Sequence, residues 1–309
     1  MDDTVMVTGA SGFIGNRLTD LLSQEKIAFL GISRSDKTNS IPFRSVGDIN
    51  EKTDWSNVLT NITTVVHLAA RAHIMQDHTH NPLASFRKTN VQGTLNLARQ
   101  ATEQGVKRFI FISTIKVHGE QTTNTPFKAT DILSPTDPYA ISKKEAEEGL
   151  IEIGRKTELE IVIIRPPLVY GKGASGNIAR LQKIISHGIP LPFKMIHNKR
   201  SLIGIDNLCD CIITCLNHPN ATKAPLLVSD NNDISTPKFI RLLAQSTTKS
   251  AKLLPVPLPL LRFLAKLAGK EQDIKRLTEN LQIDCSETMH LLNWIPPVNL
   301  KRGFQWSSP

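Results

Sequence analysis

Residues 5–15 read Val-Met-Val-Thr-Gly-Ala-Ser-Gly-Phe-Ile-Gly, and this stretch decides the fold. Its first three residues are apolar without alternation, which is typical of a parallel strand covered on both faces. Gly9, Gly12 and Gly15 follow at intervals of three, ahead of a helical pattern. We expect Gly9 to allow a sharp turn, Gly12 to let backbone N–H groups approach a pyrophosphate, and Gly15 to let the helix pack closely. Strand, turn and helix in this order predict a dinucleotide site at a helix N-terminus; the alternative is an ordinary tight turn.

The end of the second predicted strand, residues 27–33, bears on the choice of dinucleotide. Folds of this kind usually place an acidic residue there, against the adenosine ribose. This chain has Ser33 and Arg34 instead, and a guanidinium binds a 2′-phosphate bidentately. We therefore favour NADP(H) over NAD(H) as the cofactor. The alternative is that Arg34 is a solvent-exposed surface residue without a phosphate partner. Asp48 and Ile49 follow a short third strand, where the Asp48 carboxylate either lies near the adenine amino group or belongs to a plain turn.

Two further segments are expected to surround a bound dinucleotide. Residues 65–70 predict a fourth buried strand, which ends in Leu68, Ala69 and Ala70. Small residues at that point let a cofactor ribose pass closely. A helix is predicted over residues 81–105, and Asn90 in its middle is a poor helix former. We expect the Asn90 side chain to make a specific hydrogen bond.

Residues with acid/base chemistry follow the fifth predicted strand, residues 109–114. That strand delivers Thr114 to the carboxyl edge of the sheet, where open α/β folds bind ligands. A proline then opens a helix that carries Tyr139 and Lys143, four residues apart on one face. A fixed ammonium beside a phenol favours the phenolate, and lowering a tyrosine pKa by about 3 units requires roughly 4 kcal/mol. The spacing predicts a proton-transferring pair.

Together these motifs resemble the extended short-chain dehydrogenase/reductase superfamily, in its nucleotide-sugar epimerase, dehydratase and reductase branch. The residues that carry the resemblance are Thr-Gly-Ala-Ser-Gly-Phe-Ile-Gly (8–15), His-Leu-Ala-Ala (67–70), Asn90, Ser113-Thr114 before Gly119, Tyr139 with Lys143, and Arg-Pro-Pro-Leu-Val-Tyr-Gly (165–171). The resemblance implies that Tyr139 is the acid/base, that Lys143 lowers its pKa and holds the nicotinamide ribose, and that Thr114 hydrogen-bonds the reacting sugar oxygen. The cofactor is then expected against Gly9, Ser11, Gly12, Phe13, Ile14, Gly15, Ser33, Arg34, Asp48, Ile49, Leu68, Ala69, Ala70, Asn90, Tyr139, Lys143 and Pro166.

The expected fold class is α/β, with a Rossmann-type doubly wound parallel sheet over residues 1–165. Prolines become frequent beyond it, which predicts a smaller C-terminal α/β substrate lobe over residues 166–309. A segment near residues 200–230 is expected to return to the main sheet. Arg200 opens a segment that resembles a family element whose arginine grips the substrate diphosphate. Asn177, Leu191 and Phe193 occupy places where the family holds the uridine nucleotide.

Two departures from the family pattern narrow the reaction. Dehydratases of this branch follow the threonine with Asp and Glu, whereas this chain has Ile115 and Lys116. An isoleucine can neither protonate a leaving hydroxyl nor abstract a proton, which argues against sugar dehydration. Leu168 stands where many relatives have an Asn that contacts the sugar. An apolar side chain there suits a deoxy carbon.

These observations leave three functional hypotheses. The leading one is an NADPH-dependent reductase acting at carbon 4 of a UDP-4-keto-6-deoxy-hexosamine for polysaccharide biosynthesis. The second is a UDP-glucose or UDP-N-acetylglucosamine 4-epimerase, which uses the same three catalytic residues but keeps NAD bound. The third, a non-catalytic dinucleotide sensor, is disfavoured because Tyr139 and Lys143 are both present.

Composition excludes several other classes. The net charge is +9, but Lys and Arg are scattered and aromatic residues make up 5% of the chain, so we expect no nucleic-acid partner. The spacing of the four cysteines suits no metal site. The chain starts Met-Asp-Asp-Thr without an apolar leader, which predicts a cytoplasmic protein.

Membrane contact and assembly are the remaining expectations. Prolines and charges interrupt the apolar residues 253–267, which rules out a bilayer span and leaves either a helix on a membrane surface or a core or subunit contact. The resemblance implies a homodimer, paired through helices around residues 81–104 and 139–155.

Overall fold

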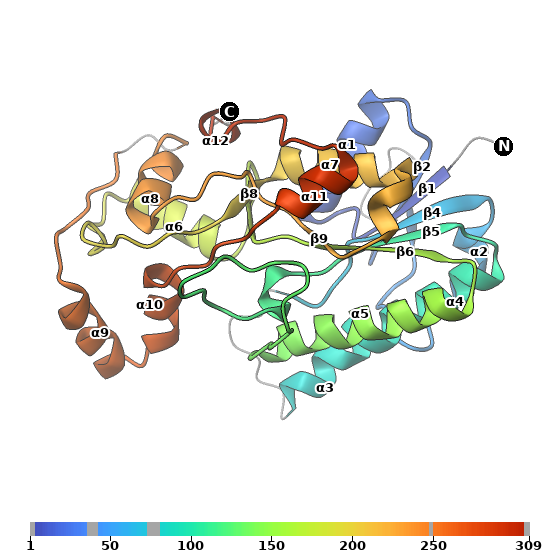
Figure 1. Ribbon diagram of the computed structural model, residues 1–309, viewed down its shortest axis with the longest axis horizontal. Coiled ribbons are helices and arrows are strands. Elements are labelled where there is room, and N and C mark those ends of the chain that lie inside the picture. Colours follow the sequence, from blue (N-terminus) through green and yellow to red (C-terminus); the bar gives the residue numbers. More distant parts are fainter. Residues whose placement is uncertain (1–3, 36–42, 73–80, 247–249, 306–309) are drawn as a thin grey trace.

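A parallel sheet of seven strands lies at the centre of the computed structural model, in the order β3-β2-β1-β4-β5-β6-β9 (Figure 1). The structure describes residues 4–35, 43–72, 81–246 and 250–305. The strands are β1 (Thr4–Thr8), β2 (Phe29–Ser33), β3 (Phe43–Ser45), β4 (Ile62–His67), β5 (Arg108–Ile112), β6 (Glu160–Arg165) and β9 (Leu226–Leu227). Since β1 pairs with both β2 and β4, the strand order reverses there, and ligands of such sheets bind at that point. The predicted doubly wound fold is confirmed.

Helices cover both faces of the sheet (Figure 1). One face carries α1 (Phe13–Gln24), α7 (Ile205–Asn217) and α11 (Ser286–Leu292), and the other carries α3 (Pro82–Arg87), α4 (Thr94–Glu103) and α5 (Pro138–Lys156). Val5 and Val7 of β1 belong to the apolar cluster under α1 and α7, whereas Met6 belongs to the cluster under α4 and α5. Burial on both faces explains why the sequence of β1 shows no alternation. The short helix α2 (Ser56–Leu59) adds Leu59 to the second cluster.

A π-helical turn interrupts the helix predicted over residues 81–105. The turn, η1 (Lys88–Gly93), joins α3 to α4 and holds Asn90 in a buried position. The side chain of Asn81 caps the start of α3 by accepting a hydrogen bond from the Ala84 amide. Such turns re-aim the side chains around them and are frequent at functional sites.

The chain after β6 builds a second, smaller lobe, on the left in Figure 1. A two-stranded parallel sheet pairs β7 (Leu168–Tyr170) with β8 (Leu202–Gly204). The lobe adds the helices α6 (Asn177–Ser186), α8 (Thr236–Ala244), α9 (Leu258–Leu267), α10 (Glu271–Thr278) and α12 (Leu300–Gly303). Between β8 and α8 the chain returns to the main sheet, where α7 covers one face and β9 pairs with β6. The short helices η2 (Ile115–Val117) and η3 (Pro219–Thr222) lie in connecting segments.

The apolar stretch at residues 253–267 ends in α9. Leu261 and Ala265 of α9 are buried, and the opposite side of the helix is exposed. Within the described ranges, no helix combines the length and apolar character that crossing a bilayer requires.

Candidate active site

The glycine-rich turn after β1 has the geometry of an anion cradle. Gly9 has a φ of +68°, and a Cβ there would lie 2.9 Å from the Ala69 nitrogen. A Cβ at Gly15 would lie 2.2 Å from the Gly9 oxygen, so only glycine allows the helix to start this close to the turn. Gly12 precedes α1, and no side chain caps this N-terminus. First-turn N–H groups and the positive end of the helix dipole are therefore available to a phosphate.

The strand β4 ends beside this turn. Its last residue, His67, is buried and bonds the Thr8 hydroxyl at 2.7 Å and the Thr94 hydroxyl at 2.9 Å. Burial, with a smaller contribution from the Lys143 charge, lowers the pKa of His67 to about 3. The Leu68 amide still donates to the Thr8 carbonyl of β1 at 3.3 Å, but the Ala69 amide donates to the Thr8 hydroxyl, so the strand stops before the predicted residues 68–70. Leu68, Ala69 and Ala70 thus form an open segment at the edge of the turn.

Asn90 connects that segment to the helix that carries Tyr139. Its amide nitrogen donates to the Arg71 carbonyl at 3.1 Å and to the Ser142 hydroxyl at 3.0 Å, and its side-chain oxygen accepts from the Arg71 amide at 2.8 Å. Ser142 in turn donates to the Tyr139 carbonyl at 2.7 Å. The specific bonds expected of Asn90 are present. Sequence reasoning missed Ser142, although its place between Tyr139 and Lys143 was a usable signal.

The predicted acid/base pair lies on the first turns of α5. Tyr139 packs edge-on against Phe86 at 6.1 Å between ring centroids, and the Lys143 ammonium lies 3.8 Å from the centroid of the Phe111 ring. Lys143 is 2% exposed, and burial lowers its pKa to about 7, against a smaller opposing effect of Glu147. The contact with Phe111 brings the Lys143 ammonium to the carboxyl end of β5.

The pKa of Tyr139 differs from the expectation. Burial by the surrounding side chains, and then the negative charge of Asp137, raise this pKa above its ordinary value, although the residue is partly exposed. Lys143 therefore does not by itself produce the lowered pKa that its spacing suggested. The reason is physical: desolvation disfavours the phenolate and the ammonium alike.

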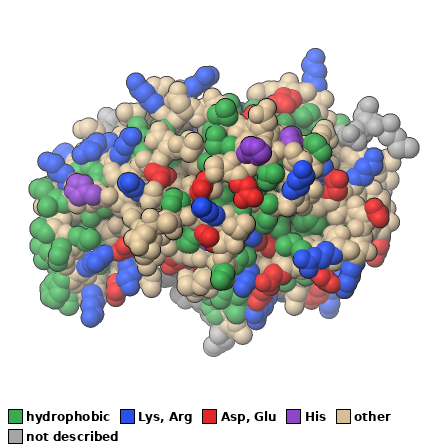
Figure 2. Space-filling view, viewed as in Figure 1, with side chains coloured by type: hydrophobic (Ala, Val, Ile, Leu, Met, Phe, Trp, Pro, Cys, Tyr) green, Lys and Arg blue, Asp and Glu red, His purple; other side chains and the backbone are tan. Residues whose placement is uncertain are grey.

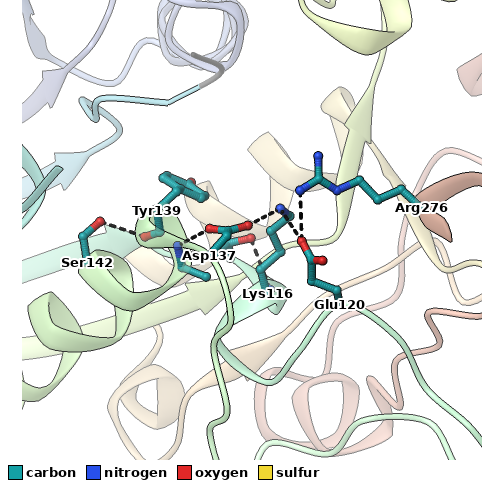
Figure 3. A network of polar contacts seen from close by, with 8 residues as sticks. Lys116, Glu120, Asp137, Tyr139, Ser142 and Arg276 are labelled. Carbon is teal, nitrogen blue, oxygen red and sulfur yellow. Dashed lines mark hydrogen bonds and ion pairs between the residues drawn. The ribbon is translucent and has the colours of Figure 1, made fainter. Parts of the chain in front are cut away.

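Lys116 is at the centre of a network of charges beside Tyr139 (Figure 3). Its ammonium lies 2.5 Å from the Asp137 carboxylate and 3.2 Å from that of Glu120. Arg276 of α10 reaches the same Glu120 oxygen at 3.2 Å. The network joins the two lobes across the carboxyl edge of the sheet.

Asp137 and Thr114 tie this network to the helix and strand ends. Asp137 caps α5 by accepting a hydrogen bond from the Ala140 amide at 2.7 Å. Burial alone would raise the pKa of Asp137, but the hydrogen bonds from Lys116 and Ala140 and the Lys116 charge hold it below its ordinary value. Thr114 caps η2, where its hydroxyl accepts from the Lys116 amide at 3.3 Å. The Pro166 carbonyl accepts from the Ile115 amide at 2.9 Å, which fixes the same segment.

A buried ion pair lies under Lys143 and was not found by sequence reasoning. The guanidinium of Arg165 contacts the Glu147 carboxylate at 2.6 Å, and the two side chains are 4% and 1% exposed. Arg165 also contacts His118 at 3.0 Å. Glu147 follows Lys143 by one helical turn, and a carboxylate on the buried face of α5 was the available signal.

The Arg34 guanidinium, expected to bind a 2′-phosphate, pairs with the Asp48 carboxylate at 3.1 Å on the surface. The Ser33 hydroxyl donates to the Ser35 carbonyl at 2.8 Å. Ile49 packs against Gly93, where an added Cβ would lie 2.7 Å from it. A phosphate bound by Arg34 would therefore lie close to a carboxylate.

The residues predicted to bind substrate are distributed over the second lobe. Arg200 donates to the Glu279 carbonyl at 3.1 Å, and burial lowers its pKa to about 10. Asn177 is exposed at the start of α6. Leu191 and Phe193 are buried in the apolar cluster of this lobe. Their side chains are core residues, so a role in binding would fall to their backbone and stays a prediction. Leu168 is 39% exposed.

The four cysteines lie in the protein interior. All four are buried as free thiols, and Cys209, Cys211 and Cys215 share α7. Among the residues that the structure describes, no three His, Cys, Asp or Glu side chains gather as a metal ion would require.

Comparisons with known proteins agree with this geometry. The family described as "NAD dependent epimerase/dehydratase family" matches residues 5–228. The chain is 45% identical to a UDP-glucose 4-epimerase of Vibrio cholerae, over 99% of this chain and 94% of that protein. It is 29% identical to the N-acetyl-alpha-D-glucosaminyl-diphospho-ditrans,octacis-undecaprenol 4-epimerase of Escherichia coli O157:H7, over 98% and 93%.

A similar fold is found in the crystal structure of a UDP-glucuronic acid 4-epimerase from Bacillus cereus in complex with NAD. The TM-score is 0.78 at 22% identity, over 98% of this chain and 94% of that one. At this identity the similarity concerns the fold. It covers both lobes.

Proposed function

The chain belongs to the NAD-dependent epimerase/dehydratase family, and we propose that it inverts carbon 4 of a UDP-linked hexose, with NAD as a tightly held cofactor. The observation that carries this proposal is the 45% identity to a UDP-glucose 4-epimerase along nearly the whole of both chains. It favours the epimerase hypothesis over the reductase hypothesis that led the sequence analysis. Ile115 and Lys116 argue against dehydration as before.

The residues present fit a dinucleotide. The turn at Gly9 and Gly15 has no room for a Cβ, and α1 begins without a side-chain cap. The buried Ser113 hydroxyl has no hydrogen-bond partner among the described residues, beside Thr114. When bound, NAD supplies a reversible hydride acceptor for carbon 4 and, in its oxidised form, a positive charge that favours a nearby phenolate.

Four side chains of this protein would then act on the substrate and the cofactor. The Tyr139 phenolate would take the proton of the 4-hydroxyl when carbon 4 is oxidised, and would return it to the same oxygen when carbon 4 is reduced again. Thr114 donates a hydrogen bond to the same oxygen and keeps it in place. Lys143 would hold the nicotinamide ribose and stabilise the phenolate by its charge, while Arg200 would bind the diphosphate.

We propose NAD rather than NADP because of the pair between Arg34 and Asp48. The Asp48 carboxylate would repel a 2′-phosphate, and it neutralises the guanidinium that was expected to bind it. The ribose hydroxyls of NAD carry no charge, so the Asp48 carboxylate does not repel them.

The test is the need for reductant. We expect the purified protein to contain NAD, released on denaturation, and to convert UDP-galactose to UDP-glucose with no added cofactor. Turnover that stops without NADPH and consumes it stoichiometrically on a 4-keto sugar would identify a reductase instead. Dinucleotide binding without turnover on any UDP-hexose or lipid-linked sugar diphosphate would support the sensor hypothesis.

A lipid-linked sugar diphosphate is a second candidate substrate. The relative from E. coli is named for such a substrate, and the exposed apolar side of α9 is the observation that favours it here. Parallel assays with UDP-N-acetylglucosamine and with N-acetylglucosaminyl-diphospho-undecaprenol in detergent decide between the two.

A further inference from the structure

A stripe of large apolar side chains runs along the outer side of α9. Leu260, Phe263, Leu264 and Leu267 follow the spacing i, i+3, i+4, i+7 and are 48%, 59%, 50% and 71% exposed. With Leu254, at 47%, they make up half of the large hydrophobic residues that are exposed in the described part of the chain. Figure 2 shows hydrophobic side chains gathered at the left edge of the molecule, where Figure 1 has α9.

Positive charge surrounds this stripe. Residues 234–270 contain seven Lys and Arg and no Asp or Glu. Lys266 and Lys270 are exposed on and just after α9. A hollow of about 190 Å³ between α9 and α10 is lined by Phe263, Lys266, Lys275 and Glu271. Glu271 pairs with Lys275 at 3.1 Å, which leaves the Lys266 charge on the α9 side of the hollow. Apolar and cationic groups thus share one surface.

We propose that α9 docks the protein on a membrane surface that carries anionic phospholipids. Leu260, Phe263, Leu264 and Leu267 would enter the boundary between headgroups and acyl chains, while Lys266 and Lys270 face the headgroup phosphates. Charge distinguishes a lipid surface from a second copy of the protein as the partner of this stripe. A second copy docked on the same stripe would bring Lys266 and Lys270 of both copies together, and like charges repel. An anionic lipid surface complements them.

The docking surface is connected to the candidate active site. Arg262 of α9 pairs with Glu279 at 2.6 Å, directly after α10. Within α10, Arg276 pairs with Glu120, which also contacts Lys116. A protein held through α9 would therefore present its second lobe to the bilayer. The proposal does not depend on the reaction, since it concerns a face without residues assigned to catalysis.

Co-sedimentation with vesicles tests the proposal. We expect the full-length protein to bind vesicles of equal parts phosphatidylglycerol and phosphatidylcholine, and to bind pure phosphatidylcholine vesicles much more weakly. Phe263→Ser and Leu267→Ser should each reduce the partition coefficient at least about tenfold. The matched controls are Ile132→Ser and Ile295→Ser, at residues 91% and 73% exposed on other surfaces, which should leave binding unchanged.

A second pair of variants tests the charge. Lys266→Glu combined with Lys270→Glu should abolish the preference for phosphatidylglycerol. Lys52→Glu, at an exposed lysine distant in sequence from α9, should leave that preference unchanged.

All variants should keep the turnover of a soluble UDP-sugar, so loss of docking and failure of the proposed function are separate results. Absence of vesicle binding, or binding that the α9 substitutions leave intact, overturns the proposal. Self-association that Phe263→Ser abolishes would assign the face to a second copy and overturn it equally.

Discussion

The Lys116 ammonium lies 2.5 Å from the carboxylate of Asp137, the residue that caps the helix bearing Tyr139. The charge of Asp137 disfavours the Tyr139 phenolate, and Lys116 offsets that charge. The pair therefore tunes the proton-transferring group without contacting the reacting atoms in the proposed reaction.

Removing the positive charge of Lys116 and removing the negative charge of Asp137 should move the pH profile of the reaction in opposite directions. Lys116→Met leaves the Asp137 charge uncompensated, so the acidic limb of kcat/KM should move to higher pH. Asp137→Asn keeps a side-chain oxygen for the cap but removes the charge, so the limb should move to lower pH. The measurement is kcat/KM for a UDP-hexose between pH 5 and 9. A shift in the same direction for both variants would show that the pair acts only by holding the helix.

Tyr139→Phe should lower kcat by about 10² to 10⁴-fold and leave cofactor content unchanged, because the glycine turn and Lys143 remain. The readouts are turnover and the NAD released on denaturation. Tyr170→Phe is the control, since Tyr170 donates to Asp230 at 2.6 Å inside the second lobe. It should cost about 1 kcal/mol of stability and little activity. More than about a tenth of wild-type turnover in Tyr139→Phe would disprove the acid/base assignment.

Glu147→Gln should destabilise the protein by about 3–5 kcal/mol, because the buried Arg165 guanidinium would lose its charged partner. Urea unfolding at neutral pH measures the difference. Glu152→Gln on the same helix is the matched control, as its pair with Lys156 is exposed, and it should have no measurable effect. Equal effects of the two changes would mean that burial of the pair has no energetic consequence.

His67 makes stability depend on pH in acid. Its folded-state pKa of about 3 lies below the ordinary 6.5, so the unfolded chain binds the proton first. The stability linked to His67 is therefore complete above pH 6.5 and is lost as the pH falls towards 3, at up to about 1.4 kcal/mol per pH unit. Unfolding curves at pH 8, 6, 5 and 4 measure this slope. His67→Gln should reduce the slope of the unfolding free energy against pH by the amount that one bound proton contributes. An unchanged slope would show that other groups cause the loss of stability in acid.

Asp48→Asn should make Arg34 available to a 2′-phosphate and improve NADP(H) binding about tenfold, an effect of about 1.4 kcal/mol. NAD binding should change less. Titration calorimetry of the protein freed of its cofactor gives both dissociation constants, with Arg34→Ser as the control that abolishes the gain. Tighter binding of NADP than of NAD by the wild-type protein would contradict the proposed cofactor.

The homodimer expected from the resemblance and the division of the chain at residue 165 remain predictions. The proposed contact is formed by the helices around residues 81–104, which comprise α3, η1 and α4, and by α5. Sedimentation that gives a 34.2 kDa species at micromolar concentration would count against the dimer.

Local sequence patterns determined much of this protein. The three glycines, the apolar run of β1 and the spacing of Tyr139 and Lys143 predict a Rossmann-type sheet and a catalytic helix, because strand and helix periods fix which nearby residues share a face. The buried bonds of Asn90 were expected for the same reason, since a poor helix former in mid-helix requires another partner.

Tertiary structure alone decided which distant charges meet. Lys116 with Asp137, Arg34 with Asp48, and Arg165 with Glu147 come from different elements, and only the packing of strand ends against helix starts brings them within contact distance. It also decided the direction of the Tyr139 pKa, because that direction depends on burial and on Asp137 as well as on the lysine one turn away. Pair spacing is a local property of the chain, whereas desolvation and long-range pairing are properties of the folded whole.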